Sequence, residues 1–296
     1  MGVVASIITL STTAVVLPTL SSRALATEAK VTVIAHRGAS AQAPENTLAA
    51  VDRADALGVD WVENDVQRTR DGVLVVIHDT DLKRTTDAEE VFPDRAPWKV
   101  ADFTAEEIAR LDAGSWKGKA HAGARVPTLR GYLRRVDANG QKLLLELKSP
   151  KSYPGVEEDL LELLAEERWL DQRHLRDRLV VQSFDADALR TLHGARPDLR
   201  TGFLGAPSPA ALPWYAQFTD QINPKSSTVS AAYVATVQAL GGPHGRRLEV
   251  NVWTVDEPEE VRRAVRKGVD GIITNAPDVV RETLDGRKPF AVAGTG

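Results

Sequence analysis

From residue 31 onward, short runs of β-branched and other apolar residues alternate with longer segments of helical periodicity. The first such group is an apolar run at 31–35, an amphipathic stretch at 46–58 and a second apolar run at 59–67. This order predicts a βαβ unit, in which both strands run parallel. It recurs with strands expected at 143–148, 179–184, 200–204, 219–224, 248–255 and 268–274, and helices at 156–168, 186–193, 230–240, 257–267 and 277–284. The pattern predicts an α/β fold, a (β/α)8 TIM barrel.

One apolar run does not fit this alternation. Residues 73–78 follow the strand at 59–67 too closely for a helix to lie between them. Asp71 and Gly72 separate the two runs, and an Asp-Gly pair is typical of a tight hairpin turn, which joins antiparallel strands. We therefore expect 73–78 to be an addition to the barrel and not one of its eight parallel strands.

The register of this hairpin decides where its histidine lies. A two-residue turn at Asp71-Gly72 places Asp65 directly opposite His78. A turn at Arg70-Asp71, with Gly72 as a bulge, would shift the pairing by one residue and move His78 to the other face. We favour the first register, because it explains why an otherwise apolar run ends in a histidine beside a carboxylate.

Residues 80–127 interrupt the repeating pattern. They are rich in charged residues, proline and glycine, and contain one helical stretch at 104–111 and two tryptophans, Trp98 and Trp116. We interpret them as a small inserted subdomain that follows the second barrel strand and its hairpin. Loops of this length are usually functional or disordered, so a lid over a site and a plain surface excursion both remain open.

The first 26 residues differ from the rest of the chain. They contain no acidic residue and only one basic side chain, Arg23, and they end in Ala24-Leu25-Ala26. An apolar segment followed by such a small-residue site is typical of a secretory signal peptide, although a buried N-terminal helix is an alternative. Pro18 and several hydroxyl residues make the segment too short for a membrane span. We expect a secreted protein with one barrel domain at 27–296.

Composition excludes some classes of partner and of stabilisation. The 41 acidic side chains outnumber the 37 basic ones, so no nucleic-acid surface is expected. The chain has no cysteine and must depend on its hydrophobic core for stability. Nothing in the sequence determines an oligomeric state.

Acidic residues occupy the ends of two expected barrel strands. Glu63 and Asp65 alternate along one strand and face the same way, and Glu146 ends the next parallel strand. Because barrel active sites lie at the carboxyl ends of the strands, these oxygens could hold one hard cation. Mg²⁺ and Ca²⁺ both suit such ligands, and an extracellular location favours Ca²⁺. The alternative is that Glu63 pairs with Arg68, and Glu146 with Lys148, as solvated ion pairs.

Two histidines also end apolar runs. His36 follows the first expected strand, and His78 ends the hairpin strand. Near a carboxylate cluster, such a pair can take a proton from an attacking oxygen and protonate a leaving alkoxide. We assign no chemistry to the remaining histidines, which are His121, His174, His193 and His244.

Cationic and aromatic side chains flank the same strand ends. Arg37 and Lys148 suit a phosphoryl group, or else they neutralise the carboxylates. Trp253 either fills the barrel core or forms one wall of a substrate site. Gly38 is expected to have a role in backbone conformation and not in the chemistry.

Several of these residues belong to ordered motifs. They are H-R-G at 36–38, P-E-N-T at 44–47, E-x-D at 63–65, D-G-x-x-V-V-x-H-D at 71–79, E-x-K at 146–148, Q-S-F at 182–184, W-T-V at 253–255 and G-I-I-T-N-A-P-D at 271–278. In this order, over about residues 32–285, the set resembles the glycerophosphodiester phosphodiesterase family. One departure is Asp256, where that family more often has Asn. Glu45 we interpret as structural, at the start of the helix at 46–57.

The resemblance implies a barrel with an inserted subdomain that uses one divalent metal ion, Ca²⁺ or Mg²⁺. It implies hydrolysis of small glycerophosphodiesters, such as glycerophosphocholine or glycerophosphoethanolamine, to sn-glycerol 3-phosphate and an alcohol. Carried over by position, the roles are acid and base for His36 and His78, metal binding for Glu63, Asp65 and Glu146, phosphate binding for Arg37 and Lys148, and substrate contact for Trp253.

Two other functions remain open. A phospholipase D-like barrel acting on lysophospholipid or sphingomyelin could use the same residues but needs an apolar mouth. The inserted segment offers Val91, Phe92, Trp98 and Phe103 among many charges, which favours a water-soluble substrate. An inactive secreted binding protein is a second alternative, against which the intact set of histidines and carboxylates speaks.

Overall fold

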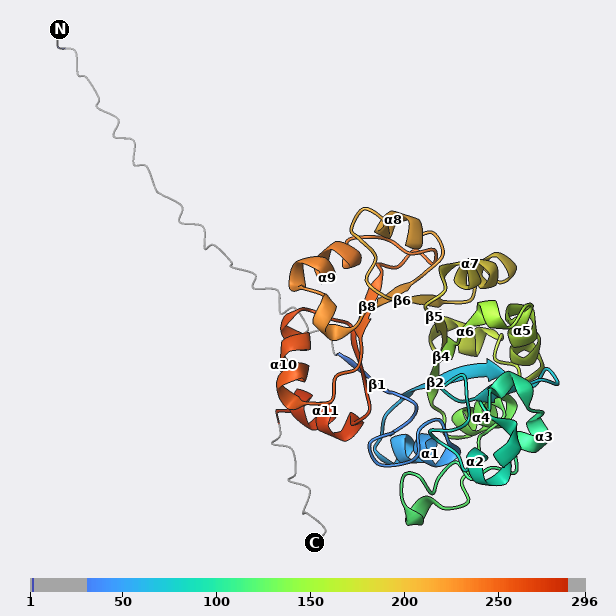
Figure 1. Ribbon diagram of the computed structural model, residues 1–296. Helices are drawn as coiled ribbons and strands as arrows, with labels where there is room; N and C mark the ends of the chain where they lie inside the picture. The colour runs from blue at the N-terminus through green and yellow to red at the C-terminus, as the bar shows by residue number, and fades with distance from the viewer. Residues whose placement is uncertain (1, 3–30, 287–296) are drawn as a thin grey trace.

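The computed structural model describes residue 2 and residues 31–286. Within them one sheet has the strand order β1-β9-β8-β7-β6-β5-β4-β2-β3, and a further β1–β2 pairing closes it into the ring seen in Figure 1. The strands are β1 (Thr32–Ala35), β2 (Trp61–Arg68), β3 (Leu74–Val76), β4 (Lys142–Leu147), β5 (Leu179–Ser183), β6 (Thr201–Leu204), β7 (Gln221–Asn223), β8 (Glu249–Val252) and β9 (Gly271–Thr274). Neighbours in the ring are parallel, and β3 alone is antiparallel, which confirms the predicted (β/α)8 barrel. The expected leader at 1–26 lies outside the described residues, apart from Gly2.

Helices surround the ring (Figure 1). Those of the barrel are α1 (Leu48–Ala56), α4 (Leu129–Ala138), α5 (Val156–Glu166), α6 (Gln172–Asp177), α7 (Ala186–Ala195), α8 (Leu212–Tyr215), α9 (Ala231–Gln238), α10 (Pro258–Arg266) and α11 (Pro277–Leu284). Short 3-10 turns are η1 (Pro93–Arg95), η2 (Val100–Asp102), η3 (Lys119–His121), η4 (Pro150–Ser152) and η5 (Ser226–Thr228), and the inserted segment adds α2 (Ala88–Val91) and α3 (Ala105–Ile108). In the part of the chain that the structure describes, no helix combines the length and apolar character that crossing a membrane requires.

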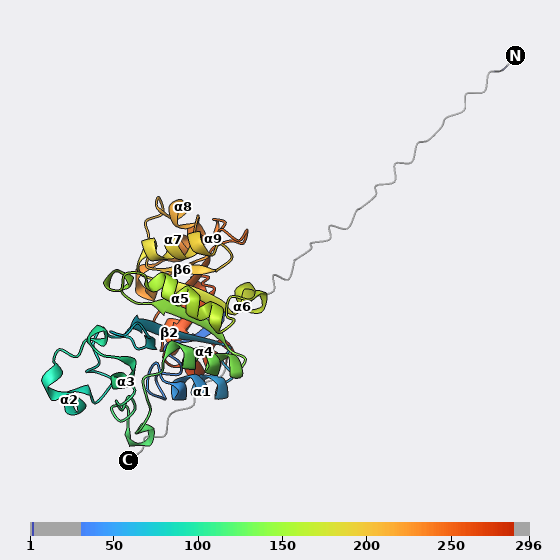
Figure 2. The same cartoon turned by 90° about the vertical axis from the view of Figure 1, so that its right-hand side faces the viewer.

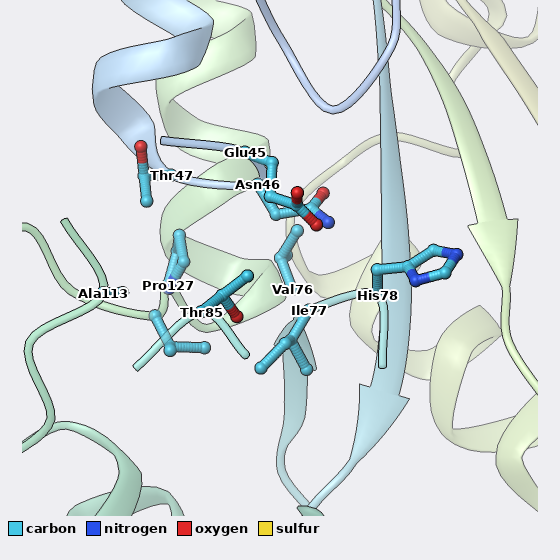
Figure 3. Close-up of a pocket in the computed structure, with 10 residues that line it drawn as sticks. Glu45, Asn46, Thr47, Val76, Ile77, His78, Thr85, Ala113 and Pro127 are labelled. Carbon is cyan, nitrogen blue, oxygen red and sulfur yellow. The ribbon is translucent and has the colours of Figure 1, made fainter. Parts of the chain in front are cut away.

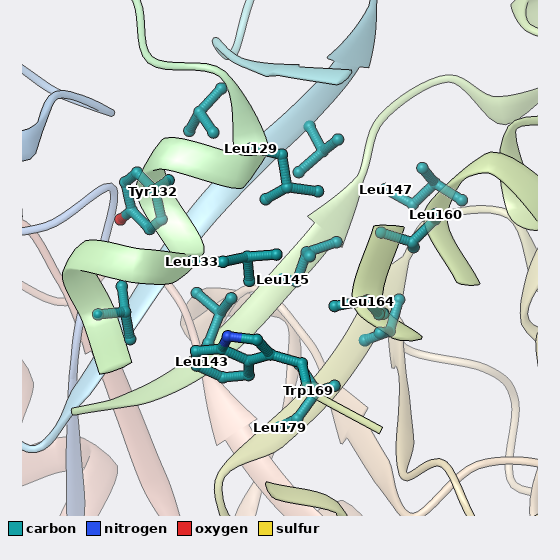
Figure 4. Packing of buried hydrophobic residues seen from close by; sticks show 14 of the residues in the cluster. Leu129, Tyr132, Leu133, Leu143, Leu145, Leu147, Leu160, Leu164, Trp169 and Leu179 are labelled. Carbon is teal, nitrogen blue, oxygen red and sulfur yellow. The ribbon is translucent and has the colours of Figure 1, made fainter. Parts of the chain in front are cut away.

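Helix α4 was not among the helices expected from the sequence. Its Gly and three arginines hide an apolar stripe at helical spacing, formed by Leu129, Tyr132, Leu133 and Val136, all fully buried. The side chain of Thr128 accepts a hydrogen bond from the backbone N–H of Gly131 and caps the helix. Figure 4 shows this stripe packed with leucines of β4 and with Trp169.

The first helix begins later than expected. Thr47 is its N-cap, and the threonine hydroxyl accepts from the backbone N–H of Ala50. Glu45 therefore lies before the helix, and the prediction that it stands at the start of the helix is wrong. Its carboxylate instead contacts two arginines, as described below.

A layer of apolar side chains fills the barrel interior. Ile34, Leu144, Val180 and Ile273 come from four different strands, are almost fully buried and form one cluster with Trp61 and Trp253. Nearer the carboxyl ends of the strands, the inward positions carry polar side chains. The apolar layer is therefore the floor under any site at that end.

The hairpin after β2 has the register that we did not favour. The pairs are Val66 with Val76, Gln67 with Val75 and Arg68 with Leu74. Gly72 has φ of 84° and its N–H donates to Thr69, so the turn is a three-residue loop that ends in a glycine bulge. A left-handed backbone is available to glycine without steric cost, which explains why Gly72 closes the loop as a bulge.

In this register Asp65 lies opposite Ile77, whose N–H donates to the Asp65 carbonyl at 2.9 Å. The predicted pairing of Asp65 with His78 is wrong. β3 ends at Val76, and His78 follows in a bend outside the ladder. Because His78 lies outside the strand, the alternation of side chains along β3 does not determine the direction of the His78 side chain.

The inserted segment has a hydrophobic core of its own. Leu82, Phe103, Ile108 and Leu111 are buried there, and the cluster continues onto the hairpin through Val75 and Ile77. Figure 2 shows α2 and α3 standing apart from the ring of barrel helices. The segment is a small packed body that is seated on β3.

A buried phenylalanine tests this description. Phe103 has no exposed surface and packs against Phe92 with ring centroids 5.2 Å apart. Replacing it with alanine should destabilise the segment by about 3–5 kcal/mol, because it removes a large side chain and leaves a cavity. Chemical denaturation measures the loss. Val265→Ala, at a site with 41% of the side chain exposed, is the control and should cost under ~0.5 kcal/mol.

Candidate active site

Three carboxylates meet at the carboxyl ends of β2 and β4. Asp65 and Glu146 are direct neighbours in the parallel register, and Glu63 lies two residues earlier on β2. All three are buried, and one oxygen from each lies within 4.8 Å of the others. The structure therefore brings together the three residues that the sequence suggested as metal ligands.

Burial of like charges shifts the pKa values of these groups. Burial, together with the charges of Asp65 and Glu146, raises the pKa of Glu63 well above its usual value. Burial and Asp65 raise the pKa of Glu146 to about 7. Burial would also raise the pKa of Asp65, but Arg37 and Lys148 outweigh it and lower that pKa. Without a cation beside them, Glu63 and Glu146 favour their neutral forms at moderately acidic pH.

The donor set fits a divalent cation. Asp65 Oδ1 is buried and accepts no hydrogen bond, which is costly for an ionised oxygen unless a cation satisfies it. Three converging carboxylates offer the oxygen ligands that Mg²⁺ and Ca²⁺ prefer. A metal ion would also relieve the repulsion that raises the pKa values of Glu63 and Glu146.

Side-chain amides hold Glu63 from inside the barrel. Gln182 Nε2 donates to Glu63 Oε1 at 3.5 Å, Asn223 Nδ2 donates to Gln182 at 2.9 Å, and Asn251 Nδ2 donates to Asn223 at 3.2 Å. The backbone N–H of Arg37 donates to the other Glu63 oxygen at 2.9 Å. The chain of amides crosses β5, β7 and β8, so it orients Glu63 from the far wall of the barrel. Sequence analysis missed it, although all three amides occupy inward positions near strand ends.

Asn46 holds Asp65 through two hydrogen bonds. Its Nδ2 donates to Asp65 Oδ2 at 2.8 Å, and its Oδ1 accepts from the Asp65 backbone N–H at 3.2 Å. Asn46 has φ of 61°, a left-handed conformation that asparagine adopts more readily than most residues. The asparagine of the P-E-N-T motif thus fixes one carboxylate of the triad.

A hydrogen bond to Asn275 fixes His36 at Nδ1. His36 Nδ1 is 2.7 Å from Asn275 Oδ1, while His36 Nε2 lies 4.0 Å from Glu63. Asn275 Nδ2 donates to Asp256 at 2.8 Å, and Asp256 also accepts from the Asn275 backbone N–H. Because a carboxylate only accepts, it turns the Asn275 oxygen toward His36, which must then carry its proton on Nδ1. Nε2 is left free to accept a proton.

Asp256 therefore acts on the site through Asn275. A carboxylate at this position can orient Asn275 in one way only. An asparagine there could both donate and accept.

The imidazole of His36 stays neutral over a wide pH range. Burial and the neighbouring Arg37 lower its pKa to about 4, although Asp65 and the hydrogen bond to Asn275 oppose this. A neutral histidine with a free Nε2 at pH 7 suits proton abstraction.

His78 faces the same site in spite of the unexpected register. It lines a small pocket together with Glu45 and Asn46, and Asn46 is hydrogen-bonded to Asp65. His78 Nδ1 is 2.6 Å from Asp79 Oδ1. Figure 3 shows Ile77 and the His78 imidazole pointing in different directions. The bend after Val76, and not strand pairing, delivers this histidine.

The two cations neutralise the carboxylates in this structure. Arg37 Nε lies 3.2 Å from Asp65, and Lys148 Nζ lies 2.8 Å from Glu146 and 3.6 Å from Asp65. Arg37 has φ of 59° and is followed by Gly38, where a Cβ atom would come within 2.6 Å of Ala50. Glycine thus allows the turn that aims Arg37 inward.

Aromatic rings border the mouth next to Lys148. Trp253 donates through Nε1 to the Asn223 carbonyl at 2.8 Å and meets Phe184 edge to face at 5.8 Å between ring centroids. Phe184 is 54% exposed, and the Lys148 ammonium lies over its ring at 5.8 Å. Trp253 thus packs on the barrel floor and also supports an exposed ring that sequence analysis missed.

The other histidines have partners elsewhere. His174 is buried, and its Nδ1 lies 2.7 Å from Asp171. His244 bonds to Asp220 and packs near His193, and His121 lies in the inserted segment.

A model of the glycerophosphoryl diester phosphodiesterase family matches residues 36–279. The chain belongs to this family. It is 36% identical over 253 residues to a glycerophosphodiester phosphodiesterase of Caldanaerobacter subterraneus subsp. tengcongensis, covering 85% of this chain and 96% of that protein. It is 31% identical over 271 residues to a glycerophosphodiester phosphodiesterase of Bacillus subtilis, covering 87% of each.

A solved structure agrees with this family assignment. An Oleispira antarctica phosphodiesterase in complex with the product sn-glycerol-3-phosphate superposes with a TM-score of 0.71 at 28% identity, covering 86% of this chain and 96% of that one. The span matched by the family includes both histidines and all three carboxylates. The carboxylate triad is consistent with the metal dependence of the glycerophosphoryl diester phosphodiesterase family.

The lowered pKa of His36 can be measured. In metal-free protein, NMR titration of ¹⁵N-labelled histidine should show His36 neutral at pH 7, with a pKa of about 4. Between the unfolded value of about 6.5 and this folded value, the unfolded chain binds the extra proton, so stability falls as pH falls through that range. His36→Gln should weaken this dependence. A folded pKa at or above the unfolded value would contradict the burial argument.

Proposed function

We propose that this protein hydrolyses glycerophosphodiesters to sn-glycerol 3-phosphate and an alcohol. The observation that carries the proposal is the convergence of three buried carboxylates with two histidines, each held at Nδ1. The names of its relatives in the glycerophosphoryl diester phosphodiesterase family support it, as does the product bound to the Oleispira antarctica enzyme.

Charge neutralisation is the first requirement of this reaction. A phosphodiester anion repels nucleophiles until its oxygens are neutralised, and Arg37 and Lys148 bring positive charge to the site. A divalent cation held by Glu63, Asp65 and Glu146 would supply further electrostatic stabilisation of the phosphate. We favour Ca²⁺ over Mg²⁺, because we also propose that residues 1–26 direct secretion into a compartment rich in Ca²⁺.

The two histidines divide the proton transfers. His36, kept neutral by burial, accepts the proton of the attacking hydroxyl at Nε2. The Nδ1–H of His78 donates to Asp79, and His78 in its doubly protonated form gives its Nε2 proton to the leaving alkoxide and becomes neutral. Attack by water and attack by the 2-hydroxyl of the substrate glycerol are both compatible with these roles.

The inserted segment argues against a lipid substrate. Phe92, Phe103 and Trp98 are large apolar residues of the inserted segment that could have lined an apolar mouth for a lipid. They pack instead in the core of the segment itself, as partly or fully buried members of one cluster. The mouth then offers the exposed Phe184 ring beside the Lys148 ammonium, which suits a small, water-soluble head group better than the acyl chain of a lysophospholipid.

Metal removal tests the role of the carboxylates. Dialysis against EDTA should abolish hydrolysis of glycerophosphocholine, because the free carboxylates would repel the substrate anion and one another. Added Ca²⁺ or Mg²⁺ should restore it, and the relative rates rank the two ions. Full activity in the chelator would refute the metal site.

Single substitutions test the histidines. His36→Ala and His78→Ala should each lower kcat roughly 10² to 10⁴ fold, the usual contribution of a positioned acid or base, with the fold retained. His193→Ala is the control and should leave kcat nearly unchanged, because His193 lies beside His244 and outside the site. Equal losses at all three positions, with lower melting temperatures, would indicate that only stability had changed.

A further inference from the structure

One arginine of the inserted segment contacts two carboxylates of the barrel and hairpin. Arg84 Nε lies 2.6 Å from Asp79 Oδ2, and its Nη2 lies 3.1 Å from Asp79 Oδ1. The same guanidinium donates to both oxygens of Glu45, at 2.9 and 2.7 Å. Both carboxylate oxygens of Asp79 and both of Glu45 thus accept from the Arg84 guanidinium.

Each of these carboxylates reaches a residue of the candidate active site. Asp79 accepts from His78 Nδ1 at 2.6 Å. Glu45 accepts from Arg37 Nη1 at 2.9 Å, and Arg37 in turn pairs with Asp65. A continuous path of charged hydrogen bonds therefore runs from His78 through Arg84 to Arg37, and an ion pair continues it from Arg37 to Asp65, one of the three carboxylates.

We propose that Arg84 is a positioning residue through which the inserted segment sets the orientation and tautomer of His78. The proposal rests on the function proposed above, since it concerns the same reaction. Arg84 touches no candidate reacting atom. It acts on Asp79, and Asp79 acts on the imidazole.

The electrostatics of Asp79 support this role. Burial would raise the pKa of Asp79, but hydrogen bonds from Arg84 and His78 outweigh it and bring the pKa to about 2. The carboxylate is therefore ionised throughout the neutral range and must accept a proton-bearing Nδ1 from His78. This leaves Nε2 of His78 directed away from Asp79 and available for proton transfer.

The inserted segment is tied to the barrel beside this arginine. Leu82, two residues away, has no exposed surface and belongs to the core of the segment. Thr85, the next residue, lines a small pocket together with Glu45 and His78, as Figure 3 shows. Lys117 makes a second tie, since its Nζ donates to the Ser40 carbonyl at 2.7 Å. The packing of the segment thus fixes the backbone from which Arg84 reaches out.

An ordinary surface ion pair would not have this effect. Exposed pairs contribute little to stability and do not orient their partners. Arg84 is 44% exposed, but its partners Glu45 and Asp79 are only 12% and 25% exposed. Its planar fork satisfies two carboxylates at once, which a lysine ammonium cannot do in the same geometry.

Kinetic comparison of three variants tests the proposal. Arg84→Met should lower kcat about 10 to 100 fold through a misplaced His78, with KM almost unchanged because Arg84 does not contact the substrate. Arg84→Lys should recover only part of the loss, since one ammonium can hold one carboxylate. Lys83→Met is the matched control: Lys83 is adjacent, exposed and paired with Glu89 at 3.0 Å, and its loss should leave both constants unchanged.

NMR of ¹⁵N-labelled histidine gives a readout that does not depend on turnover. In the wild type, His78 should carry its neutral-state proton on Nδ1, and His78→Gln assigns the signal. In Arg84→Met this tautomer should give way to a mixture, while Lys83→Met retains it. A melting temperature for each variant separates positioning from loss of folding.

Three outcomes would overturn the proposal. The first is an unchanged kcat in Arg84→Met. The second is a loss of kcat with the His78 tautomer unchanged, and the third is an altered KM alone, which would make Arg84 a substrate contact. If the wild type did not hydrolyse glycerophosphodiesters, the proposed function would fail, but the tautomer of His78 in the two variants would still decide the role of Arg84.

Discussion

The mutual repulsion of three buried carboxylates is the constraint on which the rest of the site depends. One oxygen of each of Glu63, Asp65 and Glu146 lies within 4.8 Å of the others. Burial and the charges of the neighbouring carboxylates raise the pKa values of Glu63 and Glu146, whereas Arg37 and Lys148 lower that of Asp65. The barrel holds the three carboxylates there because parallel strands end side by side. Arg37 and Lys148 offset part of the negative charge, and the remainder would favour a divalent cation.

Hydrogen-bond partners of fixed character transmit this arrangement to the histidines. Asp256 can only accept, so it orients Asn275, which fixes the proton of His36 on Nδ1. Asp79 does the same for His78 directly. Nε2 of both histidines is therefore available for proton transfer. His36 is held by a residue at the end of the last barrel strand, and His78 is held by the hairpin and the inserted segment.

Sequence patterns predicted the barrel and the convergence of Glu63, Asp65 and Glu146, because both depend on periodicity and on which residues end strands. The hairpin register was wrong because an Asp-Gly pair is compatible with two turns, and packing of Val75 and Ile77 into the core of the inserted segment accompanies the one observed. Helix α4 was missed because arginines mask its apolar stripe. The contacts of Glu45 were missed because they join residues far apart in the chain, which no local pattern encodes.

On several barrel strands, the residue that packs in the apolar core and the residue that lies in the site are two positions apart. Along several strands the inward position changes from an apolar floor residue to a polar site residue two positions later: Ile34 to His36, Trp61 to Glu63, Leu144 to Glu146, Val180 to Gln182 and Ile273 to Asn275. Since side chains alternate with a period of two, a single strand fixes both layers in the same register. A strand could not slip to move its site residue without also withdrawing a residue from the floor, so the packing of the floor holds the geometry of the site.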